Sequence, residues 1–140
     1  MTAKEFLNRG YRVRQRIEAK EKRIADWEQR ATTITLTLSP VASFSSLPSK
    51  KIEDSACAVV DLQNEIRAEI NELAGIEKEI GAAINKAVAD PTLKLLLELR
   101  YLNYLKWEEI ALILGYTFRW TMTQHKKALK IFEESMLIHV

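Results

Sequence analysis

The sequence contains little cysteine, glycine or proline. Its single cysteine, Cys57, has no second cysteine with which to form an internal disulfide or a cysteine zinc site. The three prolines, Pro40, Pro48 and Pro91, all fall between segments whose apolar residues recur at helical spacing, and only four glycines are present. We therefore expect a chain built almost wholly of helices.

Long apolar runs are also missing. No stretch approaches the roughly 20 apolar residues that a membrane-spanning helix needs. The first residues, MTAKEFLNRGYR, turn polar too early for a signal peptide. These absences favour a cytoplasmic protein whose cysteine stays reduced and which does not enter a membrane.

The chain has 140 residues, 47% of them hydrophobic, and a net charge of +2 from 21 Lys and Arg against 19 Asp and Glu. This length allows one domain or two very small modules and excludes a large multidomain enzyme. The apolar content is sufficient to bury a core.

Two long segments, residues 3–38 and 52–89, have apolar residues at alternating steps of three and four, as in a coiled coil. The ITLTLS stretch that begins at Ile34 continues the first helical pattern and is not expected to form a strand. The repeating positions are Phe6, Gly10, Val13, Ile17, Lys20, Ile24, Trp27, Ala31, Ile34 and Leu38 in the first segment, and Ile52, Ala56, Val59, Leu62, Ile66, Ile70, Leu73, Ile80, Ile84 and Ala87 in the second. A Ser- and Pro-containing loop at about 39–51 would reverse the chain between them.

Charge favours pairing of these two segments. Residues 1–50 carry ten basic and five acidic residues, whereas residues 51–90 carry four and nine, so the net charges are +5 and −5. Complementary charge favours an antiparallel hairpin and fixes its register, while the apolar seam provides most of the stability.

A new module begins at Asp90, which can cap a helix that starts with Pro91. Three helical pieces follow, over 91–104, 106–114 and 118–134. The predicted fold is therefore all-α: a long antiparallel, coiled-coil-like helical hairpin over 1–89, followed by a three-helix helix-turn-helix module over 90–140.

The segment from Ile110 to Tyr116 has the spacing of a helix-turn-helix. Ala111 is small enough for two helices to cross there, and Gly115 can adopt the positive φ that the turn requires. Ile110, Leu114 and Tyr116 would fill the wedge between the helices. An ordinary helical hairpin that binds no nucleic acid has the same spacing, so the pattern leaves both interpretations open.

The last third of the chain resembles region four of bacterial sigma factors, which reads the −35 promoter element. The matching phrases are LLELRYL, KWEEIALILGYTFRW and KKAL. The whole chain is similar to a family of phage and prophage proteins described as sigma-region-four-like transcriptional regulators. This resemblance implies a transcriptional regulator whose recognition helix spans residues 117–132 and enters the DNA major groove.

The sequence departs from the family pattern at two places. Lys106 stands where the family has a capping Thr or Ser. Thr121 and Gln124 replace aliphatic residues that face the wedge, while an alternative apolar face is rotated by one residue, about 100°. That alternative face comprises Phe118, Met122 and Leu129, so the sequence leaves the facing of the helix open.

The resemblance implies a groove-reading surface at Thr117, Arg119, Trp120, Met122 and Thr123, with Lys126, Lys127 and Lys130 near phosphates. Between Thr117 and Phe132 the chain has four basic residues and no acidic residue, the balance that phosphate contacts require. A merely solvated basic face is the alternative. Trp120 could contact a thymine methyl group, but a place in the core is favoured for it.

No catalytic site, cofactor site or metal site is predicted. His125, His139 and Cys57 lack companions at ligand spacing, so buried or satisfied structural roles are expected for them. Double-stranded DNA is the expected partner, with RNA polymerase and a second copy of the chain as further partners. The homodimer is expected because Tyr11, Trp27 and Leu62 lie beside the main seam. The competing function is a coiled-coil module that binds RNA polymerase or another protein without touching DNA.

Overall fold

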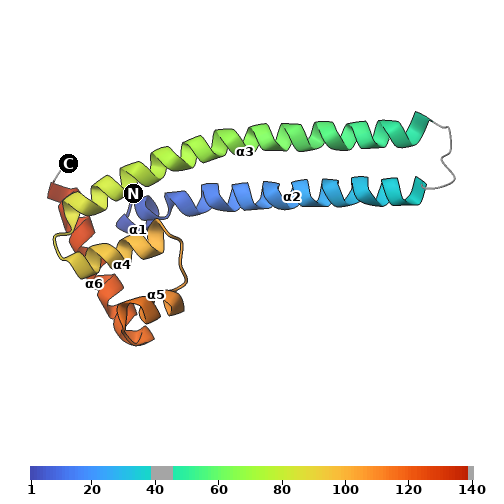
Figure 1. Cartoon of the computed structure of the whole chain (residues 1–140). Coiled ribbons are helices and arrows are strands. Elements are labelled where there is room, and N and C mark those ends of the chain that lie inside the picture. Colours follow the sequence, from blue (N-terminus) through green and yellow to red (C-terminus); the bar gives the residue numbers. More distant parts are fainter. Residues whose placement is uncertain (39–45, 139–140) are drawn as a thin grey trace. The chain divides into compact units, whose positions relative to one another are not determined.

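The computed structural model describes residues 1–38 and 46–138, and the side chains of residues 1–33 and 51–137. The elements are α1 (Ala3–Leu7), α2 (Arg9–Leu38), α3 (Ser46–Ala87), α4 (Pro91–Tyr101), α5 (Trp107–Leu114) and α6 (Phe118–Ile138), shown in Figure 1. No strand occurs among the described residues, so the expectation of an all-helical chain is confirmed. None of the helices in this part of the chain is long and apolar enough to cross a membrane.

Local sequence signals explain several helix ends. The Asp90 carboxylate accepts hydrogen bonds from the backbone N–H groups of Thr92 (2.8 Å) and Leu93 (3.2 Å), and Pro91 opens α4. This confirms the predicted helix start, with Asp90 as the N-cap and Pro91 as the first helical residue. At the beginning of the chain, Thr2 and Glu5 form a reciprocal capping box.

The predicted helix over 3–38 is interrupted. Asn8 ends α1 in a helical conformation with φ −80° and ψ −2°, and α2 begins at Arg9. Asparagine favours such ends because its side chain competes for backbone hydrogen bonds. The stretch from Ile34 to Leu38 is helical, as predicted.

The predicted loop at about 39–51 is wrong for residues 46–51, which are helical. Residues 39–45, which include Pro40, lie outside the described residues, but α3 already begins at Ser46. Pro48 is therefore the third residue of a helix. Proline is tolerated there because the first N–H groups of a helix have no acceptor within it.

The chain divides into two compact units that differ from the predicted boundary at residue 89. One unit combines Met1–Val13 with Leu73–Val140, and the other is Arg14–Glu72. The first thirteen residues and the last part of α3 thus belong with the C-terminal helices, because they contribute to one shared apolar core.

In the unit Arg14–Glu72, α2 and α3 run in opposite directions. Arg16 lies 3.5 Å from Glu72, and Lys20, four residues later in α2, pairs with Glu69, three residues earlier in α3. The two helices are therefore antiparallel. The buried seam contains Ile17, Leu62 and Ile66.

Several predictions about this seam are wrong. Ile52 and Ala56, both expected at repeating positions, are exposed, while Ser55 is buried. Ile70 is 49% exposed, and Glu69 lies at the seam in its place, because Glu69 keeps the steps of three and four that follow Leu62 and Ile66. The repeat placed Leu62 in the seam, and it is buried there, so the expectation that it lies beside the seam is wrong. Leu62 therefore does not offer apolar surface to a second copy of the chain.

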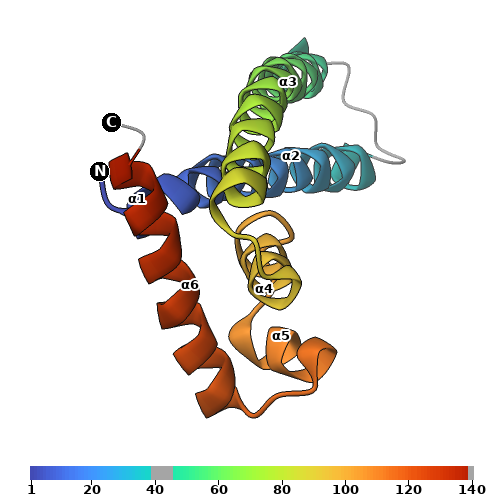
Figure 2. The same ribbon diagram turned by 90° about the vertical axis from the view of Figure 1, so that its left-hand side faces the viewer.

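The unit of Met1–Val13 and Leu73–Val140 is held by a core to which every helix in it contributes. Helix α6 packs against α1, α4 and α5, and α4 also contacts α5 (Figure 2). Its largest fully buried side chains are Leu7, Ile80, Ile84, Val88, Leu96, Leu97, Tyr101, Ile110, Thr121 and Phe132. This core fixes how α5 and α6 are presented to solvent.

A close contact between Gly10 and Tyr104 joins α2 to the connection between α4 and α5. A Cβ atom on residue 10 would lie 2.4 Å from the Tyr104 hydroxyl oxygen. That hydroxyl donates to Glu77 (2.9 Å), and the Tyr104 ring meets the edge of the Tyr11 ring. Tyr104 also has a positive φ of 59°, which non-glycine residues rarely adopt. Gly10 therefore leaves the space that Tyr104 fills.

We expect Gly10→Ala to lower the free energy of unfolding, because overpacking of about 1–3 kcal/mol outweighs the gain in helix propensity of about 1 kcal/mol. Gly75→Ala is the matched control, since no atom lies within 4 Å of its added Cβ. The control should become more stable by roughly 0.5–1 kcal/mol. Urea denaturation followed by circular dichroism measures both changes. Equal stabilisation of the two variants would contradict the close packing at Gly10.

Candidate nucleic-acid interface

The turn after α5 depends on Gly115. Its φ is 72° and its ψ 29°, in the left-handed region. Its N–H donates to the Leu112 carbonyl (3.3 Å), and the Tyr116 N–H donates to the Ala111 carbonyl (2.9 Å), which together form a Schellman motif. The expectation that Gly115 supplies the positive φ of this turn is confirmed.

Helix α5 begins without a side-chain cap. Lys106 occupies the N-cap position and makes no capping hydrogen bond with its side chain. Glu108 and Glu109 lie in the first turn, where carboxylates interact favourably with the helix dipole. Ile110 and Ala111 are the buried residues of α5, as the helix-turn-helix spacing predicted.

Thr117 starts α6 as its N-cap. Its hydroxyl oxygen accepts a hydrogen bond from the Trp120 N–H (3.1 Å). The sequence interpretation assigned Thr117 only to the DNA surface, although a threonine directly before a helix is itself a capping signal. The threonine hydroxyl therefore positions the first turn of α6.

The facing of α6 is settled by its buried side chains. Thr121, His125, Ala128 and Phe132 are buried, at helical steps of four, three and four. The buried Thr121 hydroxyl is satisfied because it donates to the Thr117 carbonyl (2.9 Å). Of the alternative apolar face, Phe118 is exposed, Met122 is half-buried, and Leu129 is half-buried against the edge of the core.

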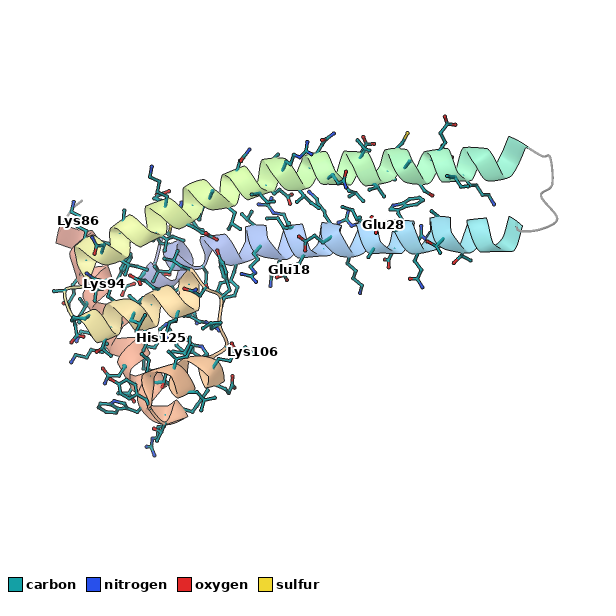
Figure 3. All side chains as sticks on the ribbon, in the orientation of Figure 1. Glu18, Glu28, Lys86, Lys94, Lys106 and His125 are labelled. Atoms are coloured by element: carbon teal, nitrogen blue, oxygen red, sulfur yellow. The ribbon has the colours of Figure 1, made fainter. Side chains whose placement is uncertain are left out.

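A buried polar pair anchors α6 to α4. The Tyr101 hydroxyl and His125 Nε2 are 2.7 Å apart, and the Trp107 ring lies 4.3 Å from the His125 ring, centre to centre. The Arg100 guanidinium lies over Trp107 and donates to the Leu105 carbonyl (2.9 Å). The expectation of a buried, satisfied His125 is confirmed; in Figure 3 it is labelled beside the helices of this unit.

Burial changes the pKa of both partners in this pair. The pKa of His125 is lowered to about 4, chiefly by desolvation and further by the positive charges of Lys4 and Arg100. Desolvation also raises the pKa of Tyr101 to about 12. Both side chains are therefore uncharged at neutral pH, so their hydrogen bond joins two neutral groups.

The structure exposes most of the predicted DNA-contacting residues at or just before α6. The exposed residues of this set are Thr117, Arg119, Trp120, Thr123, Lys126, Lys127 and Lys130, and Met122 is half-buried. Arg119, Thr123, Lys126 and Lys130 recur at steps of four, three and four, so they share one side of the helix. We name this side, with Lys127 beside it, the basic face of α6.

The preference for a core position of Trp120 is wrong. Its side chain is 49% exposed, and its ring meets the Tyr116 ring edge-on with centres 6.5 Å apart. The helix turns Trp120 outward because Thr121, the next residue, takes the buried position. An aromatic side chain is therefore available at the surface in the first turn of α6.

The remaining candidate ligands do not form a site. Cys57 is exposed on α3, contrary to the expectation of a buried or satisfied thiol, and His139 lies outside the described residues. Within residues 1–33 and 51–137, no three side chains of His, Cys, Asp or Glu are placed to share a metal ion.

The low pKa of His125 predicts that acid destabilises the chain. An unperturbed histidine titrates at 6.5 and His125 at about 4. Between these values the unfolded chain binds a proton that the folded chain does not, so the free energy of unfolding falls from about pH 7 to pH 4 by roughly 3 kcal/mol. His125→Gln should remove this part of the pH dependence in urea denaturation. Parallel curves for the two proteins would show that His125 titrates normally.

From Thr117 to Phe132, α6 thus presents four cations, no carboxylate and one exposed tryptophan, on a helix held by a buried hydrogen bond. Comparison of the chain with models of protein families, with curated proteins and with solved structures found no match.

Proposed function

We propose that the chain is a DNA-binding transcriptional regulator, in which α5 and α6 form a helix-turn-helix and α6 enters the major groove of duplex DNA. In this proposal α2 and α3 form an antiparallel hairpin that accompanies the DNA-binding module. The observation that carries it is the basic face of α6: Arg119, Lys126 and Lys130 lie opposite the buried side of the helix, and no carboxylate occurs between Thr117 and Phe132.

The chemistry of this face matches the two requirements of DNA recognition. Lys126, Lys127 and Lys130 are exposed cations that would neutralise phosphates and release counterions, which gives affinity for any sequence. Arg119 in the first turn would donate two hydrogen bonds to a guanine, and exposed Trp120 would contact a thymine methyl group.

The geometry of the turn supports the same function. The left-handed Gly115 and the capping Thr117 reverse the chain within a few residues between α5 and α6. The first turn of α6 exposes Arg119 and Trp120, and the N-terminal part of this helix is the part that contacts base edges in helix-turn-helix proteins.

A second candidate function is protein binding, and a different surface favours it. Leu112 and Ile113 on α5 are 83% and 56% exposed, adjacent apolar side chains with no cover in the described part of the chain. RNA polymerase is the candidate partner. Capture of purified polymerase by the wild-type chain, lost in Leu112→Asp, combined with no binding to duplex DNA, would favour this function over DNA recognition.

We expect the wild-type chain to bind short duplex DNA in fluorescence anisotropy, with affinity that falls steeply as salt is raised. Lys126→Ala and Lys127→Ala should each weaken binding to every duplex and reduce the slope of log K against log salt by about 0.9, the contribution of one phosphate. Lys86→Ala is the matched control, an exposed lysine on α3 (Figure 3) that should leave the slope unchanged. If the wild-type chain does not bind duplex DNA at low salt, the proposal is wrong.

Arg119→Ala should behave differently from the lysine variants. We expect it to lose about 1–3 kcal/mol of binding free energy for the preferred base at one position, because its contact reads a base and not the backbone. Selection from a pool of random duplexes, done in parallel with wild type, measures this change. If both proteins enrich the same sequences with the same strength, Arg119 does not read a base.

A further inference from the structure

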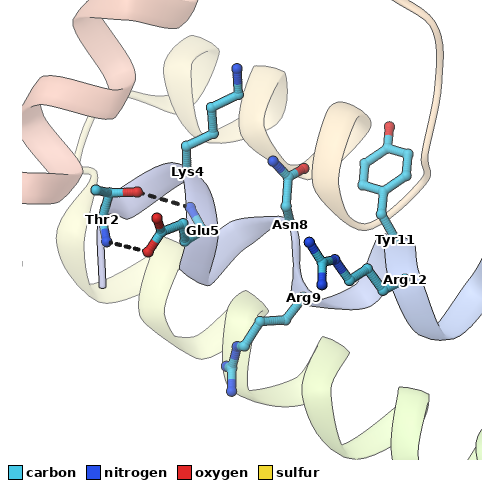
Figure 4. Close-up of a pocket in the computed structure, with 7 residues that line it drawn as sticks. All are labelled: Thr2, Lys4, Glu5, Asn8, Arg9, Tyr11 and Arg12. Atoms are coloured by element: carbon cyan, nitrogen blue, oxygen red, sulfur yellow. Dashed lines mark hydrogen bonds between the residues drawn. The ribbon is translucent and has the colours of Figure 1, made fainter.

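The unit of Met1–Val13 and Leu73–Val140 has a hollow over the junction of α1 and α2. Its volume is about 710 Å³, and its lining includes Lys4, Asn8 and Arg12, which recur at every fourth residue. Asn8 keeps a helical backbone conformation between α1 and α2, so residues at this spacing lie along one side of the junction. Figure 4 shows Lys4 and Asn8 extending in the same direction from it.

Two other charged residues of the lining are already engaged. The Glu5 carboxylate accepts the Thr2 N–H at 3.1 Å as part of the capping box. The Arg9 guanidinium lies 3.2 Å from the Glu79 carboxylate and extends away from Lys4 and Asn8 in Figure 4. The ion pairs found among the described residues include neither Lys4 nor Arg12, and both are exposed. The hollow is therefore left with net positive charge.

The hollow belongs to the same unit as the basic face of α6, and α1 packs directly on that helix. The Ala3 N–H donates to Glu133 (3.4 Å), and the rings of Phe6 and Phe132 lie 5.7 Å apart. Lys4 is close enough to α6 for its charge to lower the pKa of His125. The cations of the hollow thus keep a fixed relation to those of α6.

We propose that this hollow binds a phosphate group of the DNA backbone. The Arg12 guanidinium can donate two parallel hydrogen bonds to one phosphate, Lys4 adds a point charge, and the Asn8 amide adds a neutral donor. The inference rests on the proposed function, since it extends the DNA-contacting surface from α6 to the first residues of the chain. Contacts of this kind position a protein on the duplex without reading its sequence.

The test uses Lys4→Ala, Arg12→Ala and the double variant of the full chain in the anisotropy assay. If both side chains hold one phosphate, the double variant should reduce the salt slope by about 0.9 and weaken binding to all duplexes, with the selected sequence unchanged. Arg12→Lys should retain more affinity than Arg12→Ala, because it keeps the charge. Lys86→Ala again serves as control, and circular dichroism checks that each variant folds.

Each outcome separates this inference from the proposed function. A wild-type slope in the Lys4 and Arg12 double variant, together with a reduced slope in Lys126→Ala, overturns the phosphate site and leaves α6 as the DNA contact. A reduced salt slope in both the double variant and Lys126→Ala supports the phosphate site. Binding of inorganic phosphate at the hollow, seen as amide shifts of Asn8 by NMR, with no effect of the double variant on DNA affinity, would show a site for free anions and overturn the backbone contact.

Discussion

The hydrogen bond between Tyr101 and His125 acts together with the buried side chains of Ala128 and Phe132 to fix which side of α6 faces solvent. It joins α4 to α6 within the core, where an unpaired hydroxyl or imidazole would cost about 1–3 kcal/mol. Any rotation of α6 would break this bond and bury one of its cations. The outward direction of Arg119 and Lys126 therefore follows from a neutral contact on the opposite side of the same helix.

Local chemistry in the sequence was sufficient to predict the all-helical content, the start of α4 and the turn after α5. Asp90 and Gly115 act through their own backbone and nearest neighbours, so their roles do not depend on the rest of the fold. The break at Asn8 and the helical position of Pro48 were missed because both residues are also common in loops, and only the surrounding helix distinguishes the cases.

The facing of side chains was harder to predict, since it depends on partners far away in the sequence. Trp120 is exposed because Thr121 takes the buried position and satisfies its hydroxyl locally. Nothing in the sequence identifies Tyr101 as the partner of His125. Glu69 replaces Ile70 at the seam for a similar reason, because its partner Lys20 lies on the other helix. A half-buried ion pair of this kind disfavours shifted registers, in which both charges would be buried alone.

The contribution of Met1–Val13 to the core around α6 has a consequence for the order in which the protein forms. Leu7 is translated before Ile110 and Phe132, which complete the core in which it is buried. Leu7 can therefore reach its buried position only after α5 and α6 have been synthesised. A fragment that begins at residue 90 would expose the apolar surfaces that α1 and the end of α3 cover in the full chain.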